Sequence, residues 1–297
     1  MLKIVIDLQG AQSESRFRGI GRYSLNLALA IARNPRQHEI FLALNAAFPD
    51  SVSDLRETFR NLLPQDHIRI FEIPSPTAEC NADNYWRARA AEKIREQFLR
   101  EMNPDAVLIT SHFDGYGDNA VTSIGVFVPE LPVAAVAYDL IPYLHQTEYL
   151  SDAPYRKYYL RKMQGFIQAK LLLATSEKTR QEIITVLGYP ENNIICVSAP
   201  TGSCSETKEG DEGNDDAWDN SAKQILTAIA SRFSKSIEQV SPAFQPHKKP
   251  SLAFVSPLPP ERSSMMIVIF GLNWAKEDAK RSGRIIIRMY AQYCTGR

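Results

Sequence analysis

From residue 1 to about residue 200, short apolar runs alternate with amphipathic segments. Lys3–Asp7 is a β-branched run too short for a helix, whereas Tyr23, Leu27, Ala30 and Ile31 recur at helical spacing. Further strands are predicted at 39–44, 67–73, 106–110, 133–138, 171–175 and 194–197, an extended segment at 121–128, and helices at about 84–102, at 155–169 and in a segment ending at 187. This alternation predicts a doubly wound, Rossmann-like α/β domain with a parallel sheet over residues 1–200.

The pattern stops near residue 200. Residues 201–217 are rich in acidic residues, Gly and Ser, and we expect a solvated acidic linker. Apolar residues at helical spacing predict one isolated amphipathic helix over 218–240. Residues 241–297 read as a Pro-rich linker followed by the degenerate start of a second unit. The domain is therefore expected to carry an irregular C-terminal extension.

The charge balance and the cysteine content limit the partners and ligands that we expect. The chain has 34 basic and 34 acidic residues, so no general attraction to nucleic acid is expected. The four cysteines lack the spacing of a zinc site or a disulfide framework, which predicts no metal and fits a reducing cytoplasm. Asp7 interrupts the first apolar run, so no signal peptide is indicated, and no run approaches the length of a membrane span.

The connection after the first strand carries Gly19 and Gly21 and leads into a helix. Glycines permit close approach to a ligand, and the free N–H groups of a helix start favour an anion. A dinucleotide site would need a third glycine and an acidic residue at the end of the next strand, where the chain has Asn45. The alternative left open is a surface loop that glycines close for steric reasons alone.

Polar residues follow two buried strands. Ser111 and His112 follow one strand and Asp139 follows the next, where the ligands of open α/β sheets bind. Each has a plainer interpretation: His112 as a hydrogen-bonded histidine at a strand end, and Asp139 as a turn cap. Arg22 is read either as an anion contact or as a solvated residue of the first helical turn.

Four motifs in order carry a family resemblance: Gly19-Ile-Gly-Arg-Tyr23, Ser111-His-Phe113, Tyr138-Asp-Leu-Ile-Pro142 and Ala174-Thr-Ser-Glu177. They resemble the N-terminal half of a GT-B fold glycosyltransferase. The likeness is to family 4, in its mannosyltransferase-like group that builds bacterial O-antigen and capsule polysaccharides. The resemblance implies a retaining, metal-independent transferase without a cofactor. Such an enzyme moves a sugar from a nucleotide-sugar donor, for example GDP-mannose, to a glycan or lipid-linked glycan acceptor.

The resemblance also implies roles for single residues. Gly19, Gly21 and Arg22 match the substrate-binding glycine loop at the cleft, and His112 and Asp139 match catalytic positions. The matching histidine contacts the transferred sugar. A cation near the leaving diphosphate makes physical sense, because the charge that develops there must be stabilised.

The sequence departs from the family in its donor half. Nowhere in it do two glutamates stand eight residues apart, as in the family's donor domain, and no second alternating domain follows. We therefore expect a glycosyltransferase chain that lacks its donor-binding domain. The alternative is a non-catalytic remnant that binds acceptor or a partner protein; a nicotinamide-dependent oxidoreductase is disfavoured. A homo-oligomer and a peripheral membrane contact remain open, because a domain without its partner exposes its cleft surface.

Overall fold

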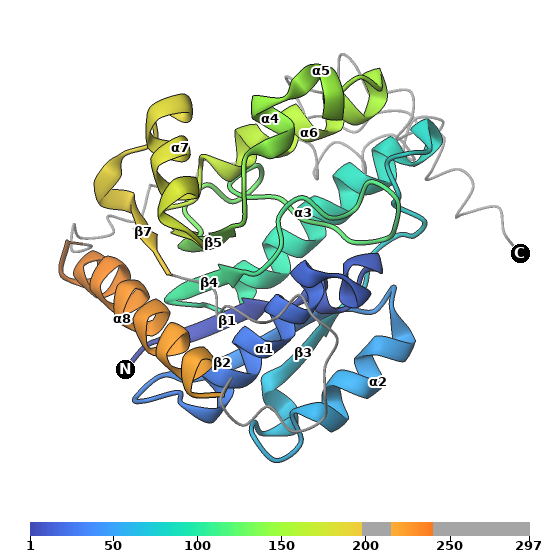
Figure 1. The fold of residues 1–297 in the computed structure, drawn as a ribbon. Helices are drawn as coiled ribbons and strands as arrows, with labels where there is room; N and C mark the ends of the chain where they lie inside the picture. The colour runs from blue at the N-terminus through green and yellow to red at the C-terminus, as the bar shows by residue number, and fades with distance from the viewer. Residues whose placement is uncertain (198–214, 240–297) are drawn as a thin grey trace, which may run out of the picture. The chain divides into compact units, whose positions relative to one another are not determined.

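The computed structural model describes residues 1–197 and 215–239 (Figure 1). Seven parallel strands form one sheet, in the order β3-β2-β1-β4-β5-β6-β7. Their bounds are β1 Lys3–Asp7, β2 Glu39–Asn45, β3 Ile68–Phe71, β4 Ala106–Ile109, β5 Val133–Ala137, β6 Leu171–Ala174 and β7 Ile194–Cys196. The predicted α/β class with a parallel, Rossmann-like sheet is thus confirmed. The strand order reverses between β1 and β4, which makes their carboxyl ends the expected place for a ligand.

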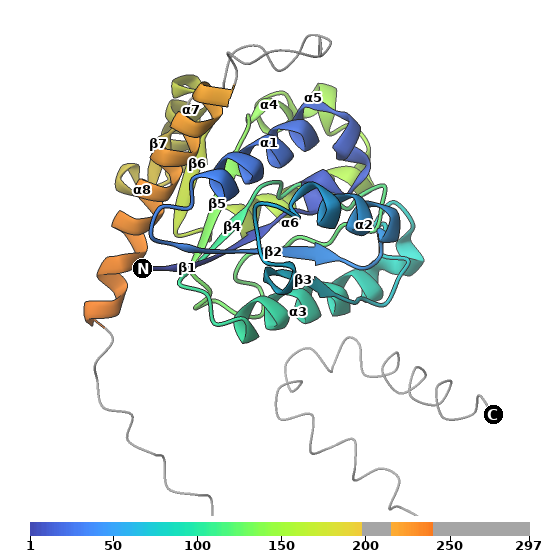
Figure 2. The same ribbon diagram turned by 90° about the horizontal axis from the view of Figure 1, so that it is seen from below.

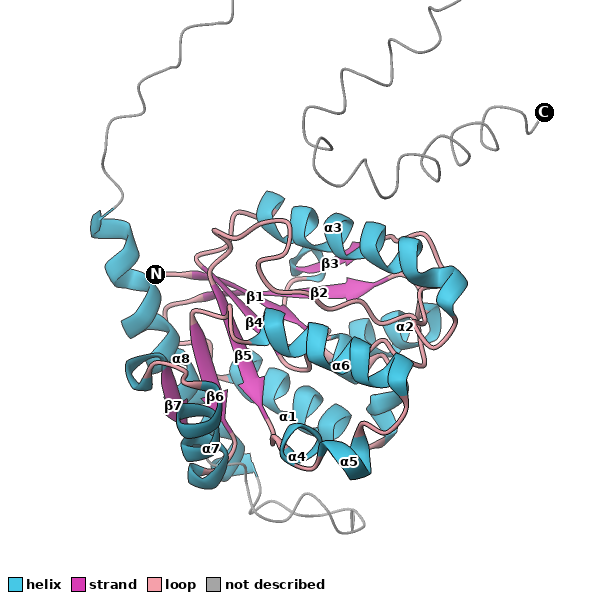
Figure 3. Ribbon diagram, turned by 90° about the horizontal axis from the view of Figure 1, so that it is seen from above, coloured by secondary structure: helices cyan, strands magenta, loops and turns pink. Residues whose placement is uncertain are grey.

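Helices cover both faces of the sheet (Figures 2 and 3). Their bounds are α1 Gly19–Arg33, α2 Pro49–Thr58, α3 Tyr85–Glu101, α4 Ile141–Leu144, α5 Gln146–Tyr149, α6 Ala153–Phe166, α7 Glu177–Leu187 and α8 Asp215–Gln239. Alternate side chains of β1 enter opposite cores: Ile4 and Ile6 pack with α1 and α8, and Val5 packs on the α3 and α6 side. This alternation explains why the strands are continuous apolar runs.

Two local predictions need correction. Gly19 and Gly21 belong to the first turn of α1, not to the loop before it. The segment 121–128 is not a strand, because side chains rather than a neighbouring strand take its amides. The Glu96 carboxylate accepts hydrogen bonds from the N–H groups of residues 126, 127 and 128 at 2.7–3.2 Å. By contrast, α7 ends at Leu187, where the helical segment was expected to end, and Gly188 caps it in the left-handed conformation.

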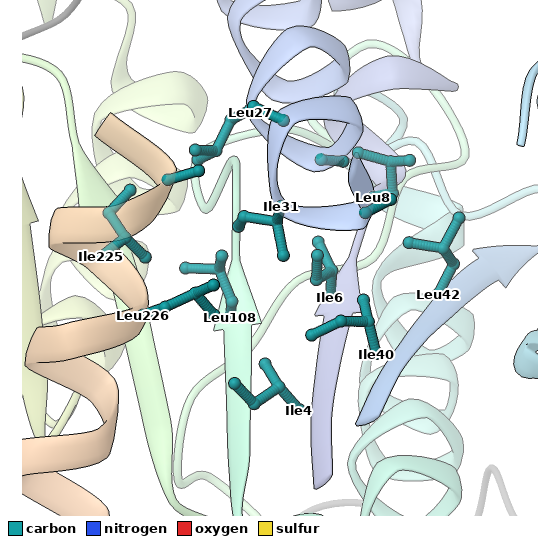
Figure 4. Packing of buried hydrophobic residues seen from close by; sticks show 14 of the residues in the cluster. Ile4, Ile6, Leu8, Leu27, Ile31, Ile40, Leu42, Leu108, Ile225 and Leu226 are labelled. Carbon is teal, nitrogen blue, oxygen red and sulfur yellow. The ribbon is translucent and has the colours of Figure 1, made fainter. Parts of the chain in front are cut away.

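The helix expected over 218–240 exists as α8, and it is not isolated. Its apolar face is buried in the core beside α1, as Figure 4 shows for Ile225 and Leu226 near Leu27 and Ile31. At the surface, Arg33 of α1 bonds Asp215 at 3.2 Å and a second carboxylate of α8. Helix α8 therefore belongs to the α/β domain. The expected acidic linker up to residue 214 and the expected second unit at 241–297 lie outside the described residues.

Candidate functional site

The carboxyl edge of the sheet is held by a buried ion pair. Asp7 ends β1, and its Oδ2 accepts from Nε of Arg95 on α3 at 2.6 Å. Both side chains are almost completely buried. Arg95 also donates through Nη1 to the carbonyl oxygen of Ser123 at 3.0 Å. The pair therefore ties the long connection between β4 and β5 to the strand ends.

Neutral amides complete this attachment. The side chain of Gln9 exchanges two hydrogen bonds with the backbone of Val121, at 2.7 and 2.9 Å. Nδ2 of Asn45 donates to Gln9 Oε1 and to the carbonyl oxygen of Asn119, both at 3.0 Å. Asn45, at the position where a dinucleotide site would carry an acid, instead anchors the connection above the switch point.

The two glycines of the α1 motif have different surroundings. A Cβ at Gly21 would lie 2.2 Å from the carbonyl oxygen of Ser15 and 2.3 Å from Cα of Arg16, so packing alone excludes a side chain there. A Cβ at Gly19 would meet nothing within 4 Å. The steric interpretation therefore holds for Gly21, whereas the surface at Gly19 is open to a ligand.

The start of α1 has the electrostatic character of an anion site. Arg18 is its N-cap without a side-chain cap, and the first turn holds no acidic residue. Arg22 is exposed, and its guanidinium has no ion pair or hydrogen bond among residues 1–197 and 215–234. The first N–H groups thus lie at one helix end with a cation that has no partner in this part of the chain, and negative charge is favoured there.

The structure places His112 inside the domain. Its Nε2 lies 2.9 Å from the carbonyl oxygen of Lys162, and its ring stacks on Phe166 and meets Phe113 edge-on. Burial first, and then the positive charge of Lys162, hold the pKa of His112 well below its usual value, so the ring is neutral. Nε2 must carry the proton because it faces a carbonyl, and Nδ1 is then an acceptor without a partner in the described part of the chain.

Asp139 is exposed at the end of β5, where its Oδ1 accepts from the N–H of Ile141 at 2.9 Å and caps a turn. Within the described residues no hydrogen bond or ion pair joins it to His112, although β4 and β5 are neighbours. The ring of Tyr138, the preceding residue, meets Tyr23 of α1 at 5.3 Å. Asp139 itself faces the α6 side: burial first, and then the charge of Asp139, raise the pKa of Tyr159, which stacks on Phe113 next to His112.

Two further residues at this edge were not identified as candidates from the sequence. Asp114 accepts from the hydroxyls of Ser13 and Ser15 at 3.2 and 2.7 Å, and burial raises its pKa. Lys162 has a buried ammonium group that bonds Thr122, in the same connection between β4 and β5 that carries Asp114. In the helix predicted over 155–169, Lys162 stands at helical spacing beside the apolar positions. This spacing was the one sign in the sequence that its side chain is buried. Nothing in the spacing of Asp114 distinguished it from an ordinary turn residue.

A pocket of about 370 Å³ lies at the opposite edge of the sheet, between the α1–β2 turn and α8. Arg36, His38 and Leu226 are among its lining residues, and none of the candidate residues above takes part. Within the described residues there is no group of three metal-binding side chains. No helix among them has both the length and the hydropathy for a membrane span.

Comparisons with known proteins identify the family of the chain. The family model described as Glycosyltransferase Family 4 matches residues 17–199, more than half of the chain. A serotype-specific mannosyltransferase, WbdA of Escherichia coli, is 32% identical over 202 residues, which cover 68% of this chain and 24% of that protein. A second Escherichia coli WbdA is 30% identical over 177 residues, or 59% of this chain and 22% of that protein. The chain thus spans about a quarter of the length of these relatives.

Solved structures with a similar course of the chain are more distant. UDP-GlcNAc 2-epimerase from Neisseria meningitidis, bound to UDP-GlcNAc, aligns with a TM-score of 0.43 at 14% identity. The alignment covers 80% of this chain and 53% of the epimerase. UGT73P12 of Glycyrrhiza uralensis, complexed with glycyrrhetinic acid 3-O-monoglucuronide, aligns with a TM-score of 0.43 at 12% identity, over 76% of this chain and 54% of that one.

Proposed function

Because the chain belongs to glycosyltransferase family 4, we propose that it acts in the transfer of a sugar from a nucleotide-sugar donor to a growing glycan. The resemblance of its motifs to this family is confirmed by the match over residues 17–199. We further propose a retaining transfer of mannose from GDP-mannose, in the synthesis of a bacterial surface polysaccharide. The similarity to the WbdA mannosyltransferases supports this choice of sugar.

The observation that carries the proposal is the open start of α1 at the carboxyl edge of the sheet. Gly19 leaves its backbone accessible, and Arg22 supplies a cation without a protein partner in the described part of the chain. A diphosphate placed there meets free N–H groups and a positive charge. These groups would stabilise the charge that develops on the departing nucleoside diphosphate.

His112 and Asp139 enter this proposal as the residues nearest the sugar. The free acceptor Nδ1 of His112 fits a donor such as a sugar hydroxyl, and Oδ2 of Asp139 has no partner within the described residues. Because the imidazole is buried, a contact between His112 and the sugar requires the connection between β4 and β5 to move away from the ring when substrate binds. Asp139 is exposed and needs no such opening.

We propose that this domain supplies the acceptor side of the cleft together with the diphosphate contact at α1, and that the remaining donor contacts, those of a donor-binding domain, are not encoded in residues 201–297. The sequence supports this, since it has no glutamate pair with the eight-residue spacing of the family's donor domain. The second candidate function is a non-catalytic acceptor-binding or interaction module of the same family. The same missing pair favours it.

Calorimetric titration with GDP-mannose, UDP-glucose and GDP tests the proposal. Saturable binding of GDP-mannose by the wild-type chain is expected, about tenfold weaker in Arg22→Ala because one charge-assisted contact is lost. Arg36→Ala, an exposed arginine at the opposite edge that bonds Thr227, is the matched control and keeps the wild-type affinity. A folded, full-mass chain that binds none of the three compounds would refute the enzyme proposal and favour the second candidate.

A further inference from the structure

The ammonium group of Lys162 is fully enclosed between α6, α3 and the connection that follows β4. Its Nζ lies 2.7 Å from Oγ1 of Thr122 and also bonds the Thr122 carbonyl oxygen. Glu92 of α3 is its nearest carboxylate, with Oε1 at 3.6 Å. The closest partners of this buried cation are therefore uncharged groups of one threonine.

These contacts close a ring of hydrogen bonds around His112. Nζ of Lys162 donates to the Thr122 hydroxyl, which donates to the carbonyl oxygen of His112. The imidazole N–H at Nε2 then donates back to the carbonyl oxygen of Lys162 at 2.9 Å. The lysine thus holds His112 twice, by its own carbonyl on the ring and through Thr122 on the backbone.

The charges around Lys162 do not require it for neutrality. Arg161 bonds Glu79 and Glu92, with its Nη1 3.0 Å from Glu92 Oε1, and Arg89 bonds the same two carboxylates. Two arginines already balance the two glutamates. Burial, partly offset by Glu92, lowers the pKa of Lys162 to about 7, and either protonation state keeps an N–H for Thr122.

We propose that Lys162 is a positioning residue for His112: its ammonium group holds the histidine in place through Thr122, and so keeps Nδ1 available as an acceptor toward the transferred sugar. This inference rests on the proposed sugar contact of His112. The lysine touches no substrate itself. Its effect is carried by the hydrogen bonds through Thr122 and by its charge, which opposes protonation of the imidazole.

The test compares full-length Lys162→Met with Arg161→Met, its neighbour in the same ion network, and with Thr122→Val. Long-range proton–nitrogen spectra report the tautomer and pKa of His112, and titration with GDP-mannose reports affinity. We expect the wild type and Arg161→Met to show a neutral Nε2–H ring near pH 7. Both Lys162→Met and Thr122→Val keep the main-chain carbonyl that accepts from Nε2–H, so the tautomer is retained. Lys162→Met is expected to raise the pKa of His112, and both variants are expected to shift the ring signals of His112.

For GDP-mannose, Lys162→Met is expected to bind about tenfold more weakly, the loss of one well-placed hydrogen bond. Added to His112→Ala it causes no further loss, because both changes act at the same contact. Unchanged pKa and ring signals of His112 in Lys162→Met, or an additive loss in the double variant, would overturn the inference. If Lys162→Met fails to fold, Thr122→Val decides the same point. A wild-type chain that does not bind GDP-mannose refutes the proposed function, and the histidine spectra then decide whether Lys162 positions the ring.

Discussion

Replacing Arg95 by methionine removes one partner of the most deeply buried ion pair at the carboxyl edge. The change deletes the bonds to Asp7 and to the Ser123 carbonyl and leaves the Asp7 carboxylate in a site that is 2% exposed. Among the described residues, Gln9 is then its remaining donor, through its backbone N–H and its Nε2, both at 3.2 Å. We expect the free energy of unfolding to fall by about 3–5 kcal/mol, since an uncompensated buried charge costs that much. A domain is stable by only about 5–15 kcal/mol, so this is a large share.

Urea unfolding followed by circular dichroism at pH 7 measures this loss. The double variant Asp7→Asn with Arg95→Met is expected to recover much of it, because no buried charge then lacks a partner. Arg33→Met, which breaks the half-exposed pair with Asp215, is the matched control and should cost less than about 1 kcal/mol. A loss below about 1 kcal/mol in Arg95→Met would refute the reasoning, as it would mean that water reaches Asp7.

Three further outcomes are expected. Leu226→Ala should lower the free energy of unfolding, measured in urea, by about 2–5 kcal/mol. Lys223→Ala, on the exposed side of α8, should change it by no more than about 0.5 kcal/mol. Equal effects would mean that α8 does not pack on the domain. Gly21→Ala should lower the melting temperature because its Cβ meets the Ser15 backbone, while Gly19→Ala leaves the packing untouched; thermal scans of both variants check this. Burial lowers the pKa of Lys162 to about 7 in the folded state, from its ordinary value of 10.5 in the unfolded state, so the unfolded state binds more protons between these two values. Stability should therefore rise with pH from about 7 toward 10 through this group, and the slope should be absent in Lys162→Met.

The sheet was readable because its strands are buried on both faces. Runs such as 106–109 and 133–137 are apolar throughout, and only a central parallel strand needs that pattern. The end of α7 at Leu187 was equally clear, since the residue after it takes a left-handed conformation that favours glycine. In contrast, the start of α1 was misplaced because Gly19 and Gly21 are poor helix formers, and packing against Ser15 overrides that preference.

The candidate site was only partly readable, for a different reason. The position of His112 after β4 follows from the strand pattern, but its enclosure depends on Lys162, fifty residues later in the chain. The sequence does not distinguish a buried lysine or aspartate from an exposed one, because burial depends on how distant segments pack together. The packing of α8 on α1 could not be predicted either, because an amphipathic pattern shows that one face of a helix is buried but not which element covers it.

That packing has a consequence for how the protein is made. The apolar face of α8 completes a core whose other members come mostly from α1 and from one face of the sheet, and Phe233 is buried with them. Contacts this distant in sequence form late, because a long segment of chain must close before they are gained. A chain emerging from the ribosome therefore exposes the apolar flank of α1 until α8 has been synthesised. During synthesis, the surface that needs protection from association is this flank, on the face of the sheet that bears α1.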